Sequence, residues 1–432
     1  MKNALVAGTL WVTFGEVLAG AASLAGSVVA ARVLDPRDFG VMGVITLAIA
    51  VLESLTASGF QEALVQKQRD VKPLLDVAWT WHVARGVALA LLLCAASPLI
   101  ARFYDEPGLA WLLAVSSVYV VLHGFHNIGT VLFSRALDFR TQFGIKAAQT
   151  LFSLAVYIPA VLVLRNVWAL VVGFVGGALI GLVVSYVAQP YRPRLEWNRE
   201  KLRELLGYGK WITGMTLIGF VITQGDDVFV SKYLGLTALG YYQLAYSISN
   251  LPATRITHVL SRVSFPTYAR LQGDVEALRR AFSGVMRTTM LITGPVSVVI
   301  WIFVPDFVNY VIGAKWQAIV PLVRILVIAG FVRSFAAIAG ALFQALGRPD
   351  LDLKMNLPRF IATIAFIWPA CALWGLAGAC LVVLVAILAT LPTWFYGVHK
   401  LIGLGPLRVL RVNALAGLAS ALLAAVLWLV HP

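Results

Sequence analysis

The segment Ser231–Gly240 reads SKYLGLTALG, and Ala31–Gly40, two hundred residues earlier, reads ARVLDPRDFG. At this offset a leucine, a basic residue and the final glycine, Gly40 or Gly240, recur at matching places. Further identities at the same offset pair Trp11 with Trp211, Thr13 with Thr213 and Val28 with Val228. The matches predict an internal repeat, which would build the fold from two copies of one helical unit.

The composition indicates the class of protein. Apolar residues make up 60% of the chain and charged residues only 12%, against about a quarter in ordinary soluble domains. Apolar runs of about 20 residues recur along the whole length, and each could cross the hydrocarbon core of a bilayer as a helix. The sequence therefore predicts an all-α polytopic membrane protein. The net charge of +14 is attributed to loop lysines and arginines that set orientation, rather than to a nucleic-acid surface.

We expect thirteen membrane spans. Twenty-three of the 34 lysines and arginines fall in loops or near span ends on the N-terminal side of this map, six fall in loops or near span ends on the opposite side, and five are counted within spans. Basic residues are enriched in cytoplasmic loops, so the N-terminus is predicted to be cytoplasmic. The predicted limits are 9–33, 39–60, 76–101, 109–134, 141–164, 167–188, 208–231, 238–261, 281–304, 318–346, 355–373, 376–398 and 408–430.

The repeat divides these spans into two sets. The second copy begins after six spans, so both copies start on the same side of the membrane and are related by an axis along its normal. We predict a six-helix lobe over 1–190, a cytoplasmic amphipathic connector over 191–207, a second six-helix lobe over 208–400 and an additional C-terminal span over 401–432. Two such lobes around a central cavity would suit alternating access.

Two local patterns concern packing. Trp197 and Leu205 belong to the expected apolar side of a connector helix on the membrane surface. Gly173, Gly177 and Gly181 recur every four residues, a spacing that allows close approach between helices.

Several longer stretches carry a family signature. They are ARVLDPRDFGVMGV at 31–44, GFQEALVQKQRD at 59–70, RPRLEWNREKLRELLGYGKW at 192–211, GDDVFVSKYLGLTALGYYQLAYSISNLP at 225–252, THVLSRVSFPTYARLQGD at 257–274 and ALFQALGRPDLDLKMN at 341–356. These stretches resemble the polysaccharide transporter family, which handles lipopolysaccharide, exopolysaccharide and O-antigen units. That family lies within the multidrug/oligosaccharidyl-lipid/polysaccharide flippase superfamily. The resemblance extends over nearly the whole chain.

The resemblance implies a flippase of the bacterial inner membrane rather than an enzyme. Its substrate would be undecaprenyl-diphosphate-linked oligosaccharide, moved from the cytoplasmic to the periplasmic leaflet for exopolysaccharide or O-antigen biosynthesis. Expected partners are this lipid-linked oligosaccharide, membrane lipids and polysaccharide polymerase or export machinery, with no cofactor, metal or nucleic acid. A peptidoglycan-precursor flippase and a multidrug exporter of the same superfamily are alternatives. A membrane polysaccharide polymerase or ligase is disfavoured, because the outer loops are too short to hold catalytic residues.

Charged groups within spans are costly and are functional candidates by default. Arg85, Arg333, Lys146 and Arg287 are expected to line a water-filled cavity, where they would bind the diphosphate and sugars of the substrate. For Lys146 and Arg287 the alternative is that the side chains extend to the lipid headgroups.

Carboxylates and histidines form a second set of candidates. His123 and His126 are three residues apart on one predicted helical face and could relay protons; the alternative is that they hydrogen-bond across helices. The carboxylates would either bind a coupling ion or act as structural partners of basic groups. They are Asp226, Asp227, Glu16 and Glu53.

Overall fold

The computed structural model describes residues 2–66, 70–136, 138–251 and 257–430, and they contain helices and connections but no strand. The α-helices are α1 (Lys2–Val33), α2 (Pro36–Leu55), α3 (Phe60–Gln66), α4 (Lys72–Phe103), α5 (Leu109–Gly124), α6 (Val131–Arg135), α7 (Phe139–Leu164), α8 (Val167–Ala188), α9 (Arg199–Tyr233), α10 (Leu236–Ser249), α11 (Thr257–Arg270), α12 (Val275–Asp306), α13 (Ile319–Ala345), α14 (Pro349–Ile402) and α15 (Pro406–Val430). Short turns of other helix types are η1 (Ile128–Thr130), η3 (Phe307–Ile312) and η4 (Ala314–Trp316).

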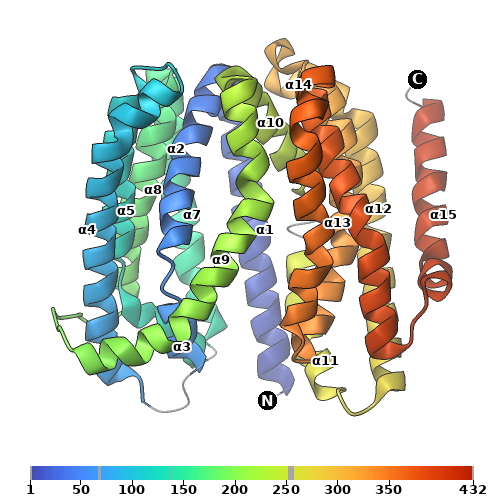
Figure 1. The fold of residues 1–432 in the computed structure, drawn as a ribbon, viewed down its shortest axis with the longest axis horizontal. Coiled ribbons are helices and arrows are strands. Elements are labelled where there is room, and N and C mark those ends of the chain that lie inside the picture. Colours follow the sequence, from blue (N-terminus) through green and yellow to red (C-terminus); the bar gives the residue numbers. More distant parts are fainter. Residues whose placement is uncertain (1, 67–69, 137, 252–256, 431–432) are drawn as a thin grey trace. The chain divides into compact units, whose positions relative to one another are not determined.

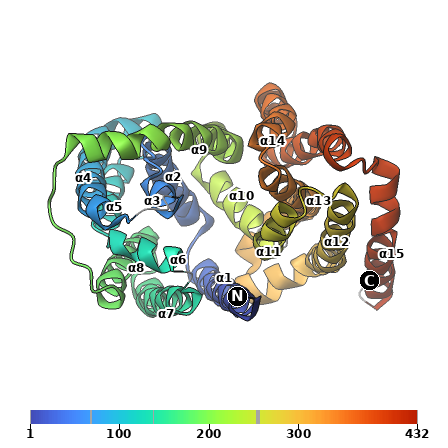
Figure 2. The same cartoon turned by 90° about the horizontal axis from the view of Figure 1, so that it is seen from below.

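The chain divides into two compact units, Met1–Gly240 and Tyr241–Pro432. The division falls near the start of α10, after α9, whereas the predicted connector covers 191–207. In Figure 1, α9 begins across the lower end of the first unit and then turns upright. In Figure 2, α7 lies between α1 and α8 in the first unit, and α13 lies among α11, α12 and α14 in the second.

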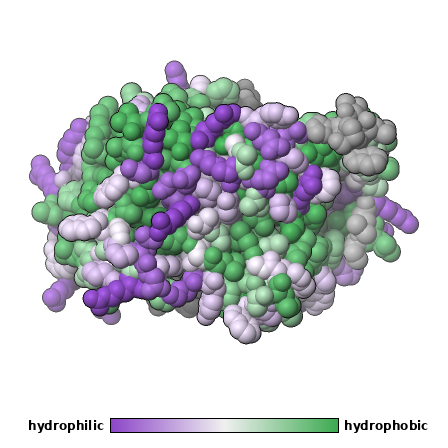
Figure 3. All heavy atoms as spheres, turned by 90° about the horizontal axis from the view of Figure 1, so that it is seen from above, coloured by the Kyte–Doolittle hydropathy of each residue, from purple (hydrophilic) through white to green (hydrophobic). Residues whose placement is uncertain are grey.

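The prediction of an all-α polytopic membrane protein is confirmed. Within the described ranges, eight helices are long and apolar enough to cross a membrane, or nine if one bent pair forms a single span. Figure 3 shows hydrophilic side chains gathered among hydrophobic ones on the end face seen from above. The predicted span 238–261 includes residues 252–256, which lie outside the described residues; α10 and α11 flank them.

Helices are interrupted at two places in the predicted spans, at Gly375 and after Gly124. The tight turn predicted between 355–373 and 376–398 lies within α14, where Gly375 has non-helical angles (φ 54°, ψ −133°) that only glycine adopts readily. The predicted span 109–134 is broken by a bend. α5 ends at Gly124, and the chain bends by 54° before it continues through η1 and α6.

The bend follows the closest approach of α4 and α5. A Cβ atom added to Gly124 would lie 2.7 Å from the carbonyl oxygen of His82, and one added to Gly86 would lie 2.9 Å from that of Val120. The two glycines therefore allow backbone contact between the helices. Beyond the bend, Asn127 accepts a hydrogen bond from the backbone N–H of Gly129 and so starts η1.

The two glycines that end the repeated segments lie against one another. A Cβ atom on Gly40 would be 1.7 Å from the carbonyl oxygen of Leu236, and one on Gly240 would be 1.8 Å from that of Pro36. The N-terminal turns of α2 and α10 thus cross in backbone contact. No side chain fits at either position without moving a helix.

The segment before α9 is an extended tether, which we define as residues 189–198. The predicted connector helix begins only at Arg199, and Asn198 caps it by accepting from two backbone N–H groups. Trp197 therefore lies outside the helix and is exposed, whereas Leu205 is buried inside it. Pro190 and Pro193 account for the extended chain, because each removes a backbone donor and restricts the residue before it.

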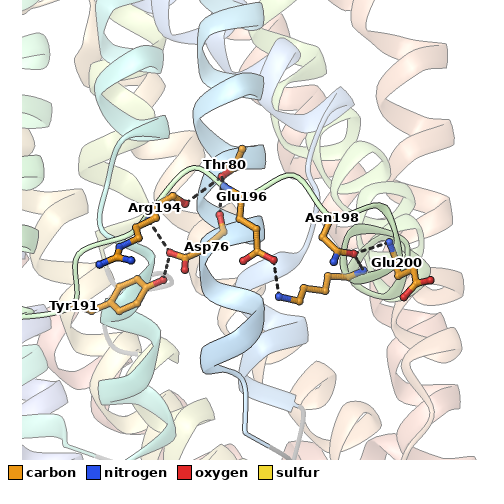
Figure 4. A network of polar contacts seen from close by, with 8 residues as sticks. Asp76, Thr80, Tyr191, Arg194, Glu196, Asn198 and Glu200 are labelled. Atoms are coloured by element: carbon orange, nitrogen blue, oxygen red, sulfur yellow. Dashed lines mark hydrogen bonds and ion pairs between the residues drawn. The ribbon is translucent and has the colours of Figure 1, made fainter.

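Polar contacts bind the tether to α4, as Figure 4 shows. Asp76 accepts hydrogen bonds from the Tyr191 hydroxyl and, at 2.7 Å, from the Arg194 backbone N–H. Thr80 accepts one from the Glu196 backbone N–H at 2.9 Å. Burial and the Asp76 carboxylate raise the pKa of the Tyr191 hydroxyl. The folded state therefore favours protonated Tyr191, and this contribution to stability is complete at neutral pH and declines only above about pH 10.

Removing the Asp76 carboxylate should loosen this tether. Asp76→Ala leaves two donors without their acceptor and is expected to cost about 2 kcal/mol of stability, and Tyr191→Phe about 1 kcal/mol. Both should lower the midpoint of thermal unfolding of the purified protein in detergent. Arg203→Ala, an exposed position on α9, serves as the control. Equal midpoints for Asp76→Ala and this control would show that the contacts do not hold the tether.

The second unit packs around α13. Phe343 of α13 stacks on Trp394 of α14, with ring centroids 5.3 Å apart and an interplanar angle of 7°. Both side chains are nearly inaccessible, and they join Phe282, Met286 and other apolar residues in one core. α13 is thus held as a central helix, and this placement matters for its one mid-helix cation, Arg333.

Candidate functional site

A small polar pocket of about 130 Å³ lies in the first unit. Arg85 of α4 donates from Nε to the Thr56 hydroxyl at 2.8 Å and from Nη2 to the backbone carbonyl of Glu53 at 3.0 Å. It thereby binds the C-terminal turn of α2, where a positive charge is favourable. Glu53 and Arg85 both line the pocket, together with His82, His123 and other residues. The predicted candidates Arg85 and Glu53 are therefore brought together.

The two predicted histidines also line this pocket, but their backbone arrangement differs from the prediction. They do not share one helical face: His123 lies in the last turn of α5, and His126 lies in the bend that follows. His123 Nδ1 is 4.0 Å from a Glu53 carboxylate oxygen. Both histidines line the small pocket and also a second, larger cavity. They stand where the two cavities adjoin.

The larger cavity, which we call the inner cavity, has a volume of about 640 Å³. It is lined by residues of α1, α5, α7 and α8, all within the first unit. On α7, Gln149, Ser153 and Tyr157 point toward α8 at four-residue spacing. Each lies over one glycine of the predicted stripe: Gln149 over Gly181, Ser153 over Gly177 and Tyr157 over Gly173. The glycine stripe thus provides space for a polar face of α7, rather than for contact between two helix backbones.

Lys146 is paired within the first unit. Its Nζ lies 2.6 Å from a carboxylate oxygen of Glu16, so the pair joins α7 to α1. The Glu16 side chain retains only 19% of its accessible surface. Both charges are candidates from the sequence, and the structure places them together as an ion pair outside the lining of the inner cavity, with the Lys146 side chain partly exposed.

Arg333 occupies the middle of α13 in the second unit. Its Nη1 donates to the Tyr246 hydroxyl at 2.5 Å and to the Asn250 side-chain oxygen at 3.0 Å, and its guanidinium lies 5.2 Å from the centre of the Tyr246 ring. The ion pairs found among residues 2–66, 70–136, 138–251 and 257–430 do not include Arg333. A cation in a membrane span is thus oriented by neutral groups.

The other candidates stand apart from these groups. Asp226 and Asp227 are buried in α9 and line neither cavity of the first unit. Arg287 is exposed on α12. Within the described ranges, no group of three or more His, Cys, Asp or Glu side chains is arranged to hold a metal ion.

Sequence reasoning missed most of the inner cavity. Gln149, Ser153 and Tyr157 are uncharged and were not singled out, although their four-residue spacing within an apolar helix is a readable signal. Tyr119 of the inner cavity and His82 of the small pocket were also missed as lining residues. Their positions depend on the Gly86–Gly124 contact and the bend after α5, which no local pattern indicates.

The fold defines the class of protein. It is similar to the lipid II flippase MurJ in an inward closed conformation, with a TM-score of 0.75, 13% identity, and coverage of 99% of this chain and 98% of that chain. It is also similar to an inward-facing multidrug resistance MATE family transporter of the MOP superfamily, with a TM-score of 0.68, 15% identity, and coverage of 93% and 96%. The chain thus has a MurJ- and MATE-like fold.

The sequence identifies the family within this class. The chain belongs to the polysaccharide biosynthesis protein family, which matches residues 29–321, so the predicted family is confirmed. It is 26% identical over 414 residues to the lipopolysaccharide biosynthesis protein WzxC of Escherichia coli K12, covering 93% of this chain and 82% of WzxC. It is 25% identical over 298 residues to the teichuronic acid biosynthesis protein TuaB of Bacillus subtilis 168, covering 68% and 61%.

Proposed function

We propose that this protein translocates undecaprenyl-diphosphate-linked oligosaccharide repeat units from the cytoplasmic to the periplasmic leaflet of a bacterial inner membrane. Family membership supports a role in polysaccharide biosynthesis. Relatives are named for the biosynthesis of three different glycans, lipopolysaccharide, teichuronic acid and succinoglycan, and the last of them is named a transport protein. Alternating access is the proposed mechanism, because MATE transporters of this fold have been solved facing inward and facing outward.

Arg333 is the observation that carries the proposal. The Arg333 guanidinium is held in the middle of a span by a phenol and an amide, and neither of these partners is an anion that would neutralise it. Planar guanidinium groups form paired hydrogen bonds with phosphate oxygens. Its Nε is buried and has no hydrogen-bond partner among the described residues. We assign Arg333 to the diphosphate of the substrate.

The remaining basic candidates take lesser roles in this proposal. Arg85 contributes positive charge beside the Glu53 pocket while it holds α2, and Lys146 is neutralised by Glu16. Arg287 is assigned to early contact with the substrate headgroup. Each assignment depends on whether the positive charge of the side chain is already paired within the protein or is available to bind the anionic substrate.

Coupling is assigned to the first unit. Glu53, His123 and His126 line one pocket and form the proposed proton relay, because an imidazole ring can both accept and donate a proton. Asp226, Asp227 and Glu16 are the other proposed carboxylates; burial of the two aspartates in α9 favours a structural role for them. The N-terminus is proposed to be cytoplasmic on the distribution of lysine and arginine.

The proposal predicts where the substrate accumulates when the gene is deleted. Lipid-linked oligosaccharide should build up in the cytoplasmic leaflet, because its synthesis continues while its transfer stops. The measurement is the fraction of this lipid accessible to a periplasmic glycosidase in spheroplasts, compared with a complemented strain. An undiminished accessible fraction in the deletion strain would contradict the proposal, provided that no second copy of the gene is present.

A further inference from the structure

The inner cavity of the first unit has an unusual lining for a protein expected to carry a diphosphate. Of the residues that enclose it, none is Asp, Glu, Lys or Arg. Uncharged hydrogen-bonding groups line it instead, from Ser23 and Ser27 on α1 to Gln149 and Ser153 on α7. A diphosphate requires cations or many backbone donors, so this cavity is not suited to the charged part of the substrate.

The polar groups of the cavity are left with hydrogen-bonding capacity. Among the described residues, no hydrogen bond is formed by the hydroxyl groups of Ser23, Ser27, Ser153 or Tyr157. Gln149 donates from Nε2 to the Gly181 carbonyl at 3.3 Å, which leaves its side-chain oxygen as an acceptor. Hydroxyl and amide groups both donate and accept, and this is the property needed to bind a ligand that is itself rich in hydroxyl groups.

Aromatic rings supply the apolar part of the lining. Tyr119 of α5 stacks on Phe174 of α8 with ring centroids 4.0 Å apart and an interplanar angle of 16°, and His123 stacks near the same tyrosine at 5.9 Å. All three line the cavity. A sugar ring has hydroxyl groups around its edge and C–H groups on its faces, so aromatic surfaces beside hydroxyl and amide groups match both parts.

The outer face of the same two helices provides a contrast. There a groove of about 800 Å³ is lined almost entirely by apolar side chains, such as Phe152, Val156 and Val183. α7 and α8 therefore separate an apolar surface from a polar one. Gln149, Ser153 and Tyr157 on the polar face are only half-buried, so their hydroxyl and amide groups are accessible to a polar ligand in the cavity.

We infer that the inner cavity is a sugar subsite, which binds one or more uncharged sugar units of the lipid-linked oligosaccharide while cations elsewhere bind the diphosphate. This inference rests on the proposed function and names which part of the substrate the first unit binds. The volume of about 640 Å³ lies within the range of small-molecule pockets. Gln149, Ser153 and Tyr157 are the binding residues to test.

Two lipids separate the sugar subsite from the diphosphate site. The probes are bare undecaprenyl diphosphate and the lipid-linked oligosaccharide extracted from the deletion strain, each titrated against the full-length protein in nanodiscs. We expect the wild type to bind the oligosaccharide-linked lipid about tenfold more tightly. The triple variant Gln149→Leu, Ser153→Ala, Tyr157→Phe should lose this preference and keep its affinity for the bare lipid.

A matched control lies on the same helix. Gln142→Leu makes the same chemical change outside the cavity, at an amide whose buried nitrogen has no partner among the described residues, and should keep the tenfold preference. A retained preference in the triple variant would overturn the sugar subsite while leaving the proposed function intact. Failure of the wild type to bind either lipid would overturn both.

A labelling experiment covers the case in which the triple variant is unstable. Ser153→Cys in a Cys94→Ser background places one accessible thiol in the cavity, because Cys371 and Cys380 are buried. We expect the oligosaccharide-linked lipid, but not the bare lipid, to slow its reaction with a small maleimide at least threefold. Equal rates with the two lipids would contradict the inference.

Discussion

Gly240→Ala should abolish the accumulation of folded protein. The new methyl group would lie 1.8 Å from the carbonyl oxygen of Pro36 and 3.0 Å from the backbone nitrogen of Gly40. Neither atom belongs to a side chain that could rotate away, so α2 and α10 would have to separate. Overpacking ordinarily costs about 1–3 kcal/mol, and an overlap with rigid backbone should reach at least the upper end. The measurement is the yield of monodisperse protein in detergent, with its midpoint of thermal unfolding.

The control for this substitution is Gly219→Ala in α9. No atom lies within 4 Å of a Cβ atom built there, and alanine favours the helix over glycine by up to about 1 kcal/mol. Its yield should equal or exceed that of the wild type. Gly40→Ala should behave like Gly240→Ala, since its methyl group meets the Leu236 carbonyl at 1.7 Å. Normal yield from both of these variants would show that the helices do not cross in this contact.

Arg333→Ala should abolish export while the protein remains folded and inserted. The substitution removes the guanidinium that is assigned to the diphosphate, and losing a charge-assisted bidentate contact costs about 2–5 kcal/mol of binding. Transport should therefore fall by more than tenfold. Arg333→Lys should recover part of the activity, because a lysine keeps the charge and loses the planar pair of donors. The measurement is complementation of polysaccharide export in the deletion strain.

Arg324→Ala provides a control on the same helix. Its guanidinium lies 4.7 Å from the Trp301 ring centre and its Nε donates to the Trp301 carbonyl, as expected of an anchor at the membrane interface. Export by this variant should remain within about twofold of the wild type. If Arg333→Ala complements as well as Arg324→Ala does, the assignment of Arg333 to the diphosphate is wrong.

Much of the fold follows from patterns that are local in sequence. Apolar runs locate the spanning helices because their length is set by the bilayer, and the glycine at position 375 marks the tight turn expected between two such runs. The broken span after Gly124 was missed, since the break depends on the contact of Gly124 with the His82 carbonyl across two helices. The predicted connector helix began at residue 191, whereas α9 begins only at Arg199, after the contacts of the tether with α4.

The candidate site was only partly predictable. Arg333, Glu53 and His123 were each candidates because charged and titratable groups in apolar runs are conspicuous, but the proximity of Glu53 and His123 was not predicted. The sequence could not distinguish Lys146, whose charge is paired with Glu16, from Arg333, whose partners are neutral. That distinction requires knowing which helices are neighbours. The polar face of α7 was overlooked because an uncharged polar residue in a membrane span costs less free energy than a charged one. Such residues therefore stand out less in the sequence.

Transport by the purified protein tests the central claim most directly. The protein would be reconstituted into vesicles that contain fluorescently labelled undecaprenyl-diphosphate-linked oligosaccharide, and a glycosidase added outside would report the fraction of exposed sugar. The account predicts that this fraction rises beyond the initial outer-leaflet share in vesicles with the wild-type protein, and does not rise with Arg333→Ala or without protein. An unchanged fraction with folded wild-type protein, under both an imposed proton gradient and a sodium gradient, would contradict it.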